Sequence, residues 1–572
     1  MKKMLFVFGI LTVFSLAVAC EGNSGDTHDI DSANNIAKGE EPQGGVLTYA
    51  ETSPFSGVLD WAHYESFNDS IALNIFSPDR LFKTGEGLRP EPNLARDWEW
   101  SKDRKTVTFF IEEGVKWHNG EKLTAEDFQF AWEVIAHADY TGPRLSNVNI
   151  IQGFKEYHSG KTDSLSGVNI IDEYTLEVTF NDAYPNAIDQ LWPYPMPKAH
   201  LEHVEVAELE DVDEIRREPV GLGPYRVTDI IPGELIEFEA FDDYWKGAPN
   251  LDGVNYRIVD GAQAAELLTQ GEIDIIKLDA SQAVTLEGDD RVTIEEVDAL
   301  SYGYLGFKLG HWDAEKKQNV MDNDKFQSKK LRQAFAYALD RQGMVDSFSE
   351  GYGTVINAPA SVISWAYPDE AMLNQYEYDP QQAMMLLDEA GYEDITGDGF
   401  VETPEGEEFT VNLTVMDTPA NISEPRAQYI IQNLQDVGIN ARLHGGQLYD
   451  YALFYELVQK DDPEIDLFLG AWSLTPDPDP TGLWKSDDVW NYTRWVNEES
   501  DKLIERGLSQ EAFDDNYRRD VYQEWHQLVN EELPIIPLSS PINIYGISHN
   551  AGGVTPDLAD AVTDAHLWYK RQ

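Results

Sequence analysis

Apolar positions along this chain follow two different periods. Several segments of seven or eight residues are continuously apolar or alternate apolar with polar positions, which is the pattern of a strand. They are 44–50, 106–112, 174–180, 234–241, 409–416 and 465–472. Longer segments repeat apolar positions every three or four residues, as an amphipathic helix does. They are 125–138, 329–341, 380–391, 425–438 and 516–533. The two kinds of segment are interspersed along the chain, which predicts an α/β fold.

Residues typical of helix caps stand at the ends of several predicted helices. Thr124 is a capping residue, and Glu126 and Asp127 follow it in the first turn. Asp379 precedes a proline at the start of another predicted helix, and Gly391 follows its last apolar position. We therefore expect helices to begin after Thr124 and Asp379 and one to end at Gly391.

The amino terminus has the layout of an export signal. Two lysines precede a continuous apolar stretch that runs to residue 19 and ends at Cys20. This stretch is shorter than the roughly 18 to 20 residues that a membrane-spanning helix requires. Cys20 is the only cysteine and stands where lipoprotein signal peptides are cleaved and acylated. The sequence predicts a signal over 1–20 and an extracytoplasmic protein with a lipid anchor at Cys20; an ordinary secretory signal is the alternative.

Residues 21–45 are polar, acidic and rich in glycine, serine and asparagine. Such a composition buries too little apolar surface to offset the entropy of ordering. We predict a flexible tether between the anchor and a folded body. That body is longer than one core supports, and no linker rich in proline and serine divides it, so we expect several domains between which the chain crosses more than once.

Charge excludes one class of partner. The chain holds 103 Asp plus Glu against 42 Lys plus Arg, a formal net charge of -61, so it is not suited to bind nucleic acid. Two interpretations of the acidity are open. The first is a carboxylate-rich surface suited to a saline environment, and it is favoured because the acidic residues are spread along the chain. The second is an electrostatic field that selects cationic ligands.

Catalytic and metal-binding motifs are missing from the sequence. Lys155 stands where a phosphate-binding loop ending at Gly160 needs a glycine, and no HExxH, CxxC or GxSxG pattern occurs. Residues 394–402 superficially resemble a calcium loop, but a turn at Asp398 is the preferred interpretation. We predict no cofactor, no metal and no enzymatic activity. A secreted hydrolase that uses two of the many carboxylates is the less favoured alternative.

A series of motifs resembles one known family over nearly the whole chain. The first spans 93–134 and includes the spelling Gly-Val-Lys-Trp-His-Asn-Gly over 114–120. The others are 221–225, 243–245, 251–253, 271–274, 331–341, 378–391, 471–484 and 533–538. In this order they resemble the family 5 extracellular solute-binding proteins, which include the oligopeptide-, dipeptide- and nickel-binding components of ABC importers. The spelling of 472–480 is similar to an oligopeptide-binding branch.

The resemblance implies a periplasmic-binding-protein-like type II fold, with two lobes, an extra domain and a ligand cleft between the lobes. The implied limits are 46–82, 217–297 and 535–572 for lobe 1, 83–216 for domain II and 298–534 for lobe 2. It also implies a monomer that captures a peptide and delivers it to a membrane permease. The same role for a non-peptide solute such as an oligosaccharide, an opine or a metal chelate is the alternative.

An extended peptide binds well by adding as a strand to an exposed backbone edge. The segment 465–473 is the best candidate for that edge. The resemblance implies that Gly470, Ala471, Trp472 and Ser473 hold the peptide main chain, with Trp472 packed on it. Leu469 stands where a well-known relative has an arginine for the ligand carboxylate.

The resemblance also implies contacts away from this segment. Peptide binders place an aspartate shortly after the tryptophan to pair with the α-ammonium group, a strong charge-assisted bond. Here that role falls to Asp477 or Asp479. Tyr64 and Glu65 in the first lobe and Tyr140 in the second domain are the other candidate cleft residues.

Overall fold

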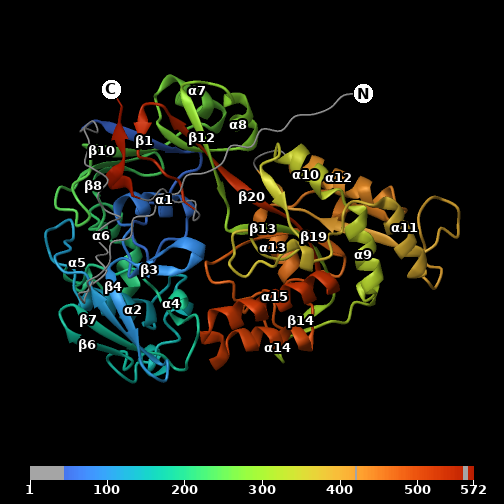
Figure 1. Cartoon of the computed structure of the whole chain (residues 1–572), viewed down its shortest axis with the longest axis horizontal. Coiled ribbons are helices and arrows are strands. Elements are labelled where there is room, and N and C mark those ends of the chain that lie inside the picture. Colours follow the sequence, from blue (N-terminus) through green and yellow to red (C-terminus); the bar gives the residue numbers. More distant parts are fainter. Residues whose placement is uncertain (1–43, 419–421, 558–563, 572) are drawn as a thin grey trace, which may run out of the picture. The chain divides into compact units, whose positions relative to one another are not determined.

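The computed structural model describes residues 44–418, 422–557 and 564–571 (Figure 1). Cys20, the predicted signal and the predicted tether as far as residue 43 lie outside the described residues. Among the helices that are described, none is both long and apolar enough to span a membrane.

The largest feature is a twelve-stranded mixed sheet. In spatial order its strands are β18 (Asn440–Leu443), β17 (Thr410–Thr414), β19 (Leu467–Ser473), β13 (Ser301–Phe307), β20 (Ile535–Ser548), β11 (Ile275–Leu278), β1 (Val46–Glu51), β10 (Gly253–Ile258), β9 (Leu235–Ala240) and β8 (Tyr225–Ile231). Two further strands, β12 (Val292–Asp298) and β16 (Gly353–Val355), also pair with β20.

β20 joins the two parts of this sheet (Figure 1). Its first half, from Ile535 to Ser539, lies opposite β13, and its second half, from Ile542 to Ser548, lies opposite β12. The chain also passes directly from β12 into β13. The chain therefore crosses between the two parts of the sheet more than once.

A separate four-stranded sheet is inserted between β1 and β8. Its strands, in spatial order, are β4 (Ala95–Trp100), β5 (Thr106–Ile111), β7 (Thr175–Thr179) and β6 (Val168–Asp172). Helix α2 (Ala125–Ala136) lies between β5 and β6 in the chain, and the short helix α4 (Ala187–Gln190) follows β7. This region falls within the predicted domain II.

Each predicted amphipathic segment overlaps a helix: α2, α9 (Lys329–Ala338), α11 (Pro380–Glu389), α12 (Ser423–Gln435) and α15 (Asp515–Glu532). Further helices have no predicted segment of their own, among them α1 (Phe67–Phe76), α10 (Arg341–Phe348), α13 (Tyr451–Gln459) and α14 (Glu498–Gly507). Thr124 donates its N–H to the Asp127 carboxylate at 2.8 Å, and Asp379 accepts from the first turn of α11. Gly391 has φ +87° just beyond α11. The predicted helix boundaries are confirmed.

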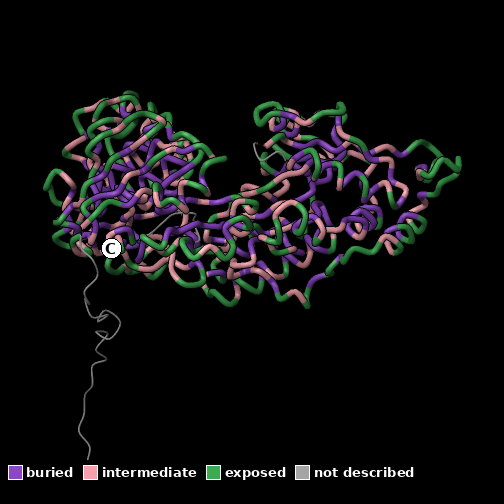
Figure 2. The backbone as a smooth tube through the Cα atoms, turned by 90° about the horizontal axis from the view of Figure 1, so that it is seen from above, coloured by how far each residue is buried: buried purple, intermediate pink, exposed green. Residues whose placement is uncertain are grey.

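Separate hydrophobic cores include the two halves of β20. One cluster draws its residues from 47–275 and from 547–568, and another lies within 302–538. A smaller third cluster packs between α7 (Ala264–Gln270), α8 (Ala280–Leu286) and β20. Figure 2 shows the buried segments enclosed by exposed loops. The predicted limits of the three domains stay a prediction.

Candidate functional site

One edge of β19 lacks a strand partner over most of its length. On one side the strand pairs with β13 from Leu467 to Ser473. On the other side β17 pairs only with Leu467 and Phe468. In the described part of the chain, no strand covers this second edge beyond Phe468. The segment predicted to bind a peptide main chain is therefore a half-open sheet edge.

One hydrogen bond shows which residues of β19 direct their backbone N–H and C=O groups toward the unpaired edge. Leu474 N–H donates to the carbonyl of Leu300, just beyond β13, at 2.8 Å. Residues of an antiparallel ladder alternate between the two edges. Trp472 and Gly470 therefore direct their backbone groups toward β13, whereas Ala471 and Ser473 direct theirs away from it. An extended ligand can pair with these outward N–H and C=O groups.

Aromatic rings pack on the face of the sheet where Gly470 and Trp472 of β19 lie. Trp472 is half-buried and stacks on Tyr492, with ring centroids 5.4 Å apart and an interplanar angle of 20°. A Cβ atom at Gly470 would lie 2.6 Å from the ring of Tyr304, the residue opposite it on β13. Glycine at this position therefore lets the tyrosine close over the strand, and the aromatic layer fixes the orientation of β19.

A pocket of about 260 Å³ opens beside the unpaired edge. Leu469, Gly470 and Ala471 form one wall of it. Apolar side chains from α10, α13 and the segment just after β17 also line it, namely Met344, Val345, Phe348, Phe454, Val415 and Met416. A ligand strand on β19 would thus place side chains in a largely apolar space.

Both aspartates predicted to receive the ligand ammonium lie together after β19. Asp477 is buried and accepts two hydrogen bonds from the guanidinium of Arg518 on α15, one of them 2.8 Å long. Asn186, at the start of α4, donates its side-chain amide to Asp479 at 3.2 Å and to Asp477 at 3.4 Å. The cluster therefore joins the start of α4 to the loop that follows β19.

A third carboxyl group adds negative charge to this cluster. Burial, and then the charge of Asp477, raises the pKa of Asp189 on α4 to about 7. The same two causes, burial first, raise the pKa of Asp479. Arg518 opposes the shift of both carboxyl groups, and Arg89 also opposes that of Asp189. The cluster therefore lacks a positive charge when all three are ionised, and a ligand cation is suited to supply it.

The candidates from the first lobe and domain II form a separate group. The guanidinium of Arg144 lies 4.4 Å from the ring of Tyr64 and donates to the Tyr64 carbonyl at 3.1 Å. The Tyr140 hydroxyl donates to the Ala62 carbonyl and is held there, and burial raises the pKa of Tyr140. Glu65 is exposed. The backbone N–H of Arg144 also donates to the Tyr140 hydroxyl at 3.3 Å, so Arg144 contacts both predicted tyrosines.

Several residues of these clusters carry no sequence signal of their own. Arg518 lies inside an ordinary amphipathic helix, and Asn186 and Asp189 lie in a short polar segment. The one available hint is Arg518, a basic residue on the buried side of its helix, which requires a partner.

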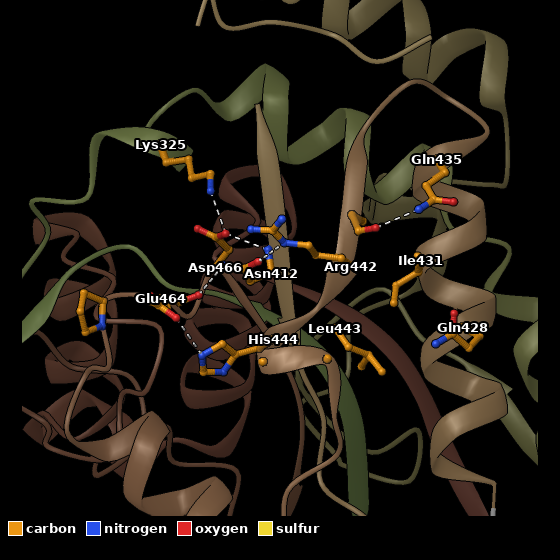
Figure 3. A pocket seen from close by; sticks show the side chains of 14 residues that line it. Lys325, Asn412, Gln428, Ile431, Gln435, Arg442, Leu443, His444, Glu464 and Asp466 are labelled. Carbon is orange, nitrogen blue, oxygen red and sulfur yellow. Dashed lines mark hydrogen bonds and ion pairs between the residues drawn. The ribbon is translucent and has the colours of Figure 1, made fainter. Parts of the chain in front are cut away.

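A larger pocket lies at the outer edge of lobe 2, beside β18 (Figure 3). Its volume is about 790 Å³. Lys325 forms an ion pair with Asp466 at 2.7 Å, and the His444 ring lies 3.8 Å from the Glu464 carboxylate. Arg442 donates to Asn412 at 2.9 Å. The described residues contain no group of three or more His, Cys, Asp or Glu placed to hold a metal ion.

Comparisons with known proteins extend over the full fold. Oligopeptide-binding protein AppA of Bacillus subtilis is 28% identical over 563 residues, covering 96% of each chain. Oligopeptide-binding protein OppA of Lactococcus lactis subsp. lactis is 25% identical over 507 residues, covering 86% of this chain and 84% of that protein.

Solved structures of similar proteins have the same fold. Lactococcal OppA, complexed with an endogenous peptide in the closed conformation, superposes with a TM-score of 0.76 at 24% identity, covering 92% of this chain and 99% of that one. AppA from Bacillus subtilis in complex with a nonapeptide gives 0.70 at 27% identity, covering 93% and 100%. The predicted two-lobed fold is confirmed.

The model of the bacterial extracellular solute-binding proteins, family 5 middle, matches residues 89–493. That range includes β19, the carboxyl groups of Asp189, Asp477 and Asp479, and most of the motifs that predicted this assignment. The chain belongs to the family 5 bacterial extracellular solute-binding proteins.

Proposed function

We propose that this chain is the substrate-binding protein of an ABC importer and that it captures oligopeptides between its two lobes. The observation that carries the proposal is the unpaired edge of β19, where Ala471 and Ser473 offer backbone groups beside a largely apolar pocket. Main-chain pairing gives affinity for any extended peptide, and the pocket selects among side chains. The names of AppA and OppA, both oligopeptide-binding proteins, support the same ligand class.

In this proposal the acidic cluster receives the ligand's α-ammonium group. Asp477 is already paired with Arg518, so its neighbours Asp479 and Asp189 provide the unbalanced charge. An ammonium group placed between them reduces the excess negative charge and forms charge-assisted hydrogen bonds. Tyr64, Glu65 and Tyr140 are the proposed contacts from lobe 1 and domain II.

Capture and release need no chemical step by this protein. Closure of the lobes would enclose the peptide and create the surface that the permease recognises. We place the protein outside the cytoplasm as a monomer, held to the membrane by acylated Cys20 and the tether of residues 21–45. Its only proposed contact with the lipid is this anchor.

Strand addition on β19 predicts a specific effect of Ala471→Pro. Proline removes the outward N–H of residue 471, and proline is tolerated at a sheet edge where that N–H has no ladder partner. One backbone hydrogen bond is lost and the ring obstructs the edge, so we expect about tenfold weaker peptide binding or more. Isothermal titration with short synthetic peptides measures this.

Ala471→Ser is the matched control, since it changes the side chain and keeps the N–H. Circular dichroism checks that both variants remain folded. A folded Ala471→Pro protein that binds peptides as tightly as the unmodified chain would show that the ligand does not pair with β19.

A further inference from the structure

The pocket beside β19 contains positive charge and no negative charge. Two arginines, Arg341 and Arg426, line it, and no aspartate or glutamate does. The chain as a whole has 103 acidic residues against 42 basic ones. A pocket lined by arginines and by no acidic side chain is therefore unexpected in so acidic a protein. In the larger pocket of Figure 3, by contrast, acidic and basic side chains pair with one another.

Arg341 has a structural use. Its guanidinium donates to the carbonyls of Ile356 at 2.7 Å and Pro537 at 3.0 Å, and to the Asn357 side chain at 3.0 Å. These bonds tie α10 to β20 and to the loop after β16. Arg341 therefore contributes charge to the pocket while its hydrogen-bonding groups serve the fold.

Arg426 has no such use. It lies in the first turn of α12, and its Nε atom is buried without a hydrogen-bond partner. Within the described residues its guanidinium forms no ion pair and no side-chain hydrogen bond. Burial lowers the pKa of Arg426, and no neighbouring carboxylate opposes that effect. An unpaired charge is costly to bury, so its counter-charge is expected to come from outside the chain.

We infer that Arg426 forms a subsite for a carboxylate group of the bound peptide. The inference rests on the proposed peptide binding. Leu469, Gly470 and Ala471 line the same pocket, so a peptide added to the β19 edge passes beside Arg426. A guanidinium presents two parallel donors that match the two oxygens of a carboxylate. The apolar lining of the pocket strengthens that pairing.

The two charged groups lie at opposite ends of the edge. Arg426 is next to the residues where the unpaired edge begins, and the acidic cluster of Asp477, Asp479 and Asp189 follows its end. A peptide with its ammonium group at the acidic cluster would run antiparallel to β19 and bring a later carboxylate to Arg426. That carboxylate is either the carboxyl terminus or an acidic side chain.

Titration calorimetry with synthetic peptides of one length tests the subsite. The series has a free amino terminus and contains a neutral peptide with an amidated carboxyl terminus, the same peptide with a free carboxyl terminus, and amidated peptides with one glutamate at each position in turn. We expect at least one carboxylate peptide to bind about tenfold tighter than the neutral amide. The peptide that binds more tightly shows whether the carboxyl terminus or a glutamate side chain supplies the carboxylate.

Arg426→Gln should remove this advantage and leave binding of the neutral amide unchanged, while Arg426→Lys should keep part of it. Arg442→Gln, a change to an exposed arginine outside this pocket, is the control and should keep all of it. An advantage that persists in Arg426→Gln, or no carboxylate preference in the unmodified chain, overturns the inference.

A second measurement separates the subsite from peptide binding. The Nε resonance of Arg426 in arginine-labelled protein, assigned by its loss in Arg426→Gln, is followed during titration with acetate. We expect a saturable shift with acetate and none with tetramethylammonium. If no peptide binds but acetate shifts the resonance, the proposed function fails and the subsite stands; an unmoved resonance overturns the subsite.

Discussion

Replacing Arg518 with methionine is expected to lower the free energy of unfolding by about 3 to 5 kcal/mol. Arg518 is buried and holds both oxygens of the buried Asp477 carboxylate. Without it, the buried Asp477 carboxylate has no ion-pair partner and still faces the carboxyl groups of Asp479 and Asp189. The loss comes from the uncompensated buried charge, since methionine fills much of the same apolar volume.

Urea unfolding of the ligand-free protein measures this loss. Arg519→Met on the same helix is the control, because Arg519 is exposed and should change stability by only a few tenths of a kcal/mol. Adding Asp477→Asn to Arg518→Met should recover part of the loss, since no ionised partner is then left unpaired. Equal stability of Arg518→Met and Arg519→Met would mean that the ion pair is not buried as described.

Peptides with a free amino terminus are expected to bind about tenfold more weakly for each pH unit below 7. The pKa of Asp189, raised to about 7 mainly by burial, means that this carboxyl holds its proton in the ligand-free protein at acidic pH. An ammonium group favours the ionised carboxylate, so binding below pH 7 must release that proton. Above about pH 8 the peptide's own amino group loses its charge.

The same shift has the opposite sign for stability. A carboxyl group whose pKa is raised on folding binds its proton more tightly in the folded state, so the ligand-free protein loses stability as the pH rises from about 4 to about 7. Affinity for the peptide therefore rises over the range in which the stability of the empty protein falls.

Calorimetry across pH with matched free and acetylated peptides tests this account of Asp189. We expect the acetylated peptide to show a flat profile, and Asp189→Asn to flatten the profile of the free peptide. Asp182→Asn, a change at an exposed carboxyl in the same segment, should leave it unaltered. Identical profiles for free and acetylated peptides would remove the ammonium group from the acidic cluster.

Local sequence patterns predicted the elements that carry the site. The predicted strand 465–472 contains most of β19, the helices at 125–136 and 380–389 begin directly after Thr124 and Asp379, and Gly391 follows the second of them. These predictions succeed because strand alternation and helix capping are local properties of the chain. The Asp477 and Asp479 pair was also visible, since both lie within a few residues of Trp472.

β20 was not predicted as a strand by its pattern. It contains Pro537 and Pro541, and proline within a run argues against a central strand. The structure accommodates Pro537 at a register shift opposite Gly303 and Tyr304, and Pro541 pairs with β16 just before the partner changes to β12. The prolines thus lie where the ladder is already irregular, and only the tertiary fold reveals this.

Local sequence patterns also could not predict which charged side chains pair over long distances in the sequence. Arg518 lies 41 residues after Asp477, and Asn186 lies 291 residues before it. Arg426 is distinguished only by the absence of a nearby acidic group in the described structure. Neither relation has a signature in spacing or composition, because each depends on how separate elements pack.

Mass spectrometry of solutes released from the protein, purified from the cells that make it and then denatured, tests peptide capture most directly. We expect a mixture of short peptides, and their common features would report the selectivity of the Arg426 pocket. A single non-peptide species recovered in place of peptides would contradict the proposed function and with it the role of the β19 edge.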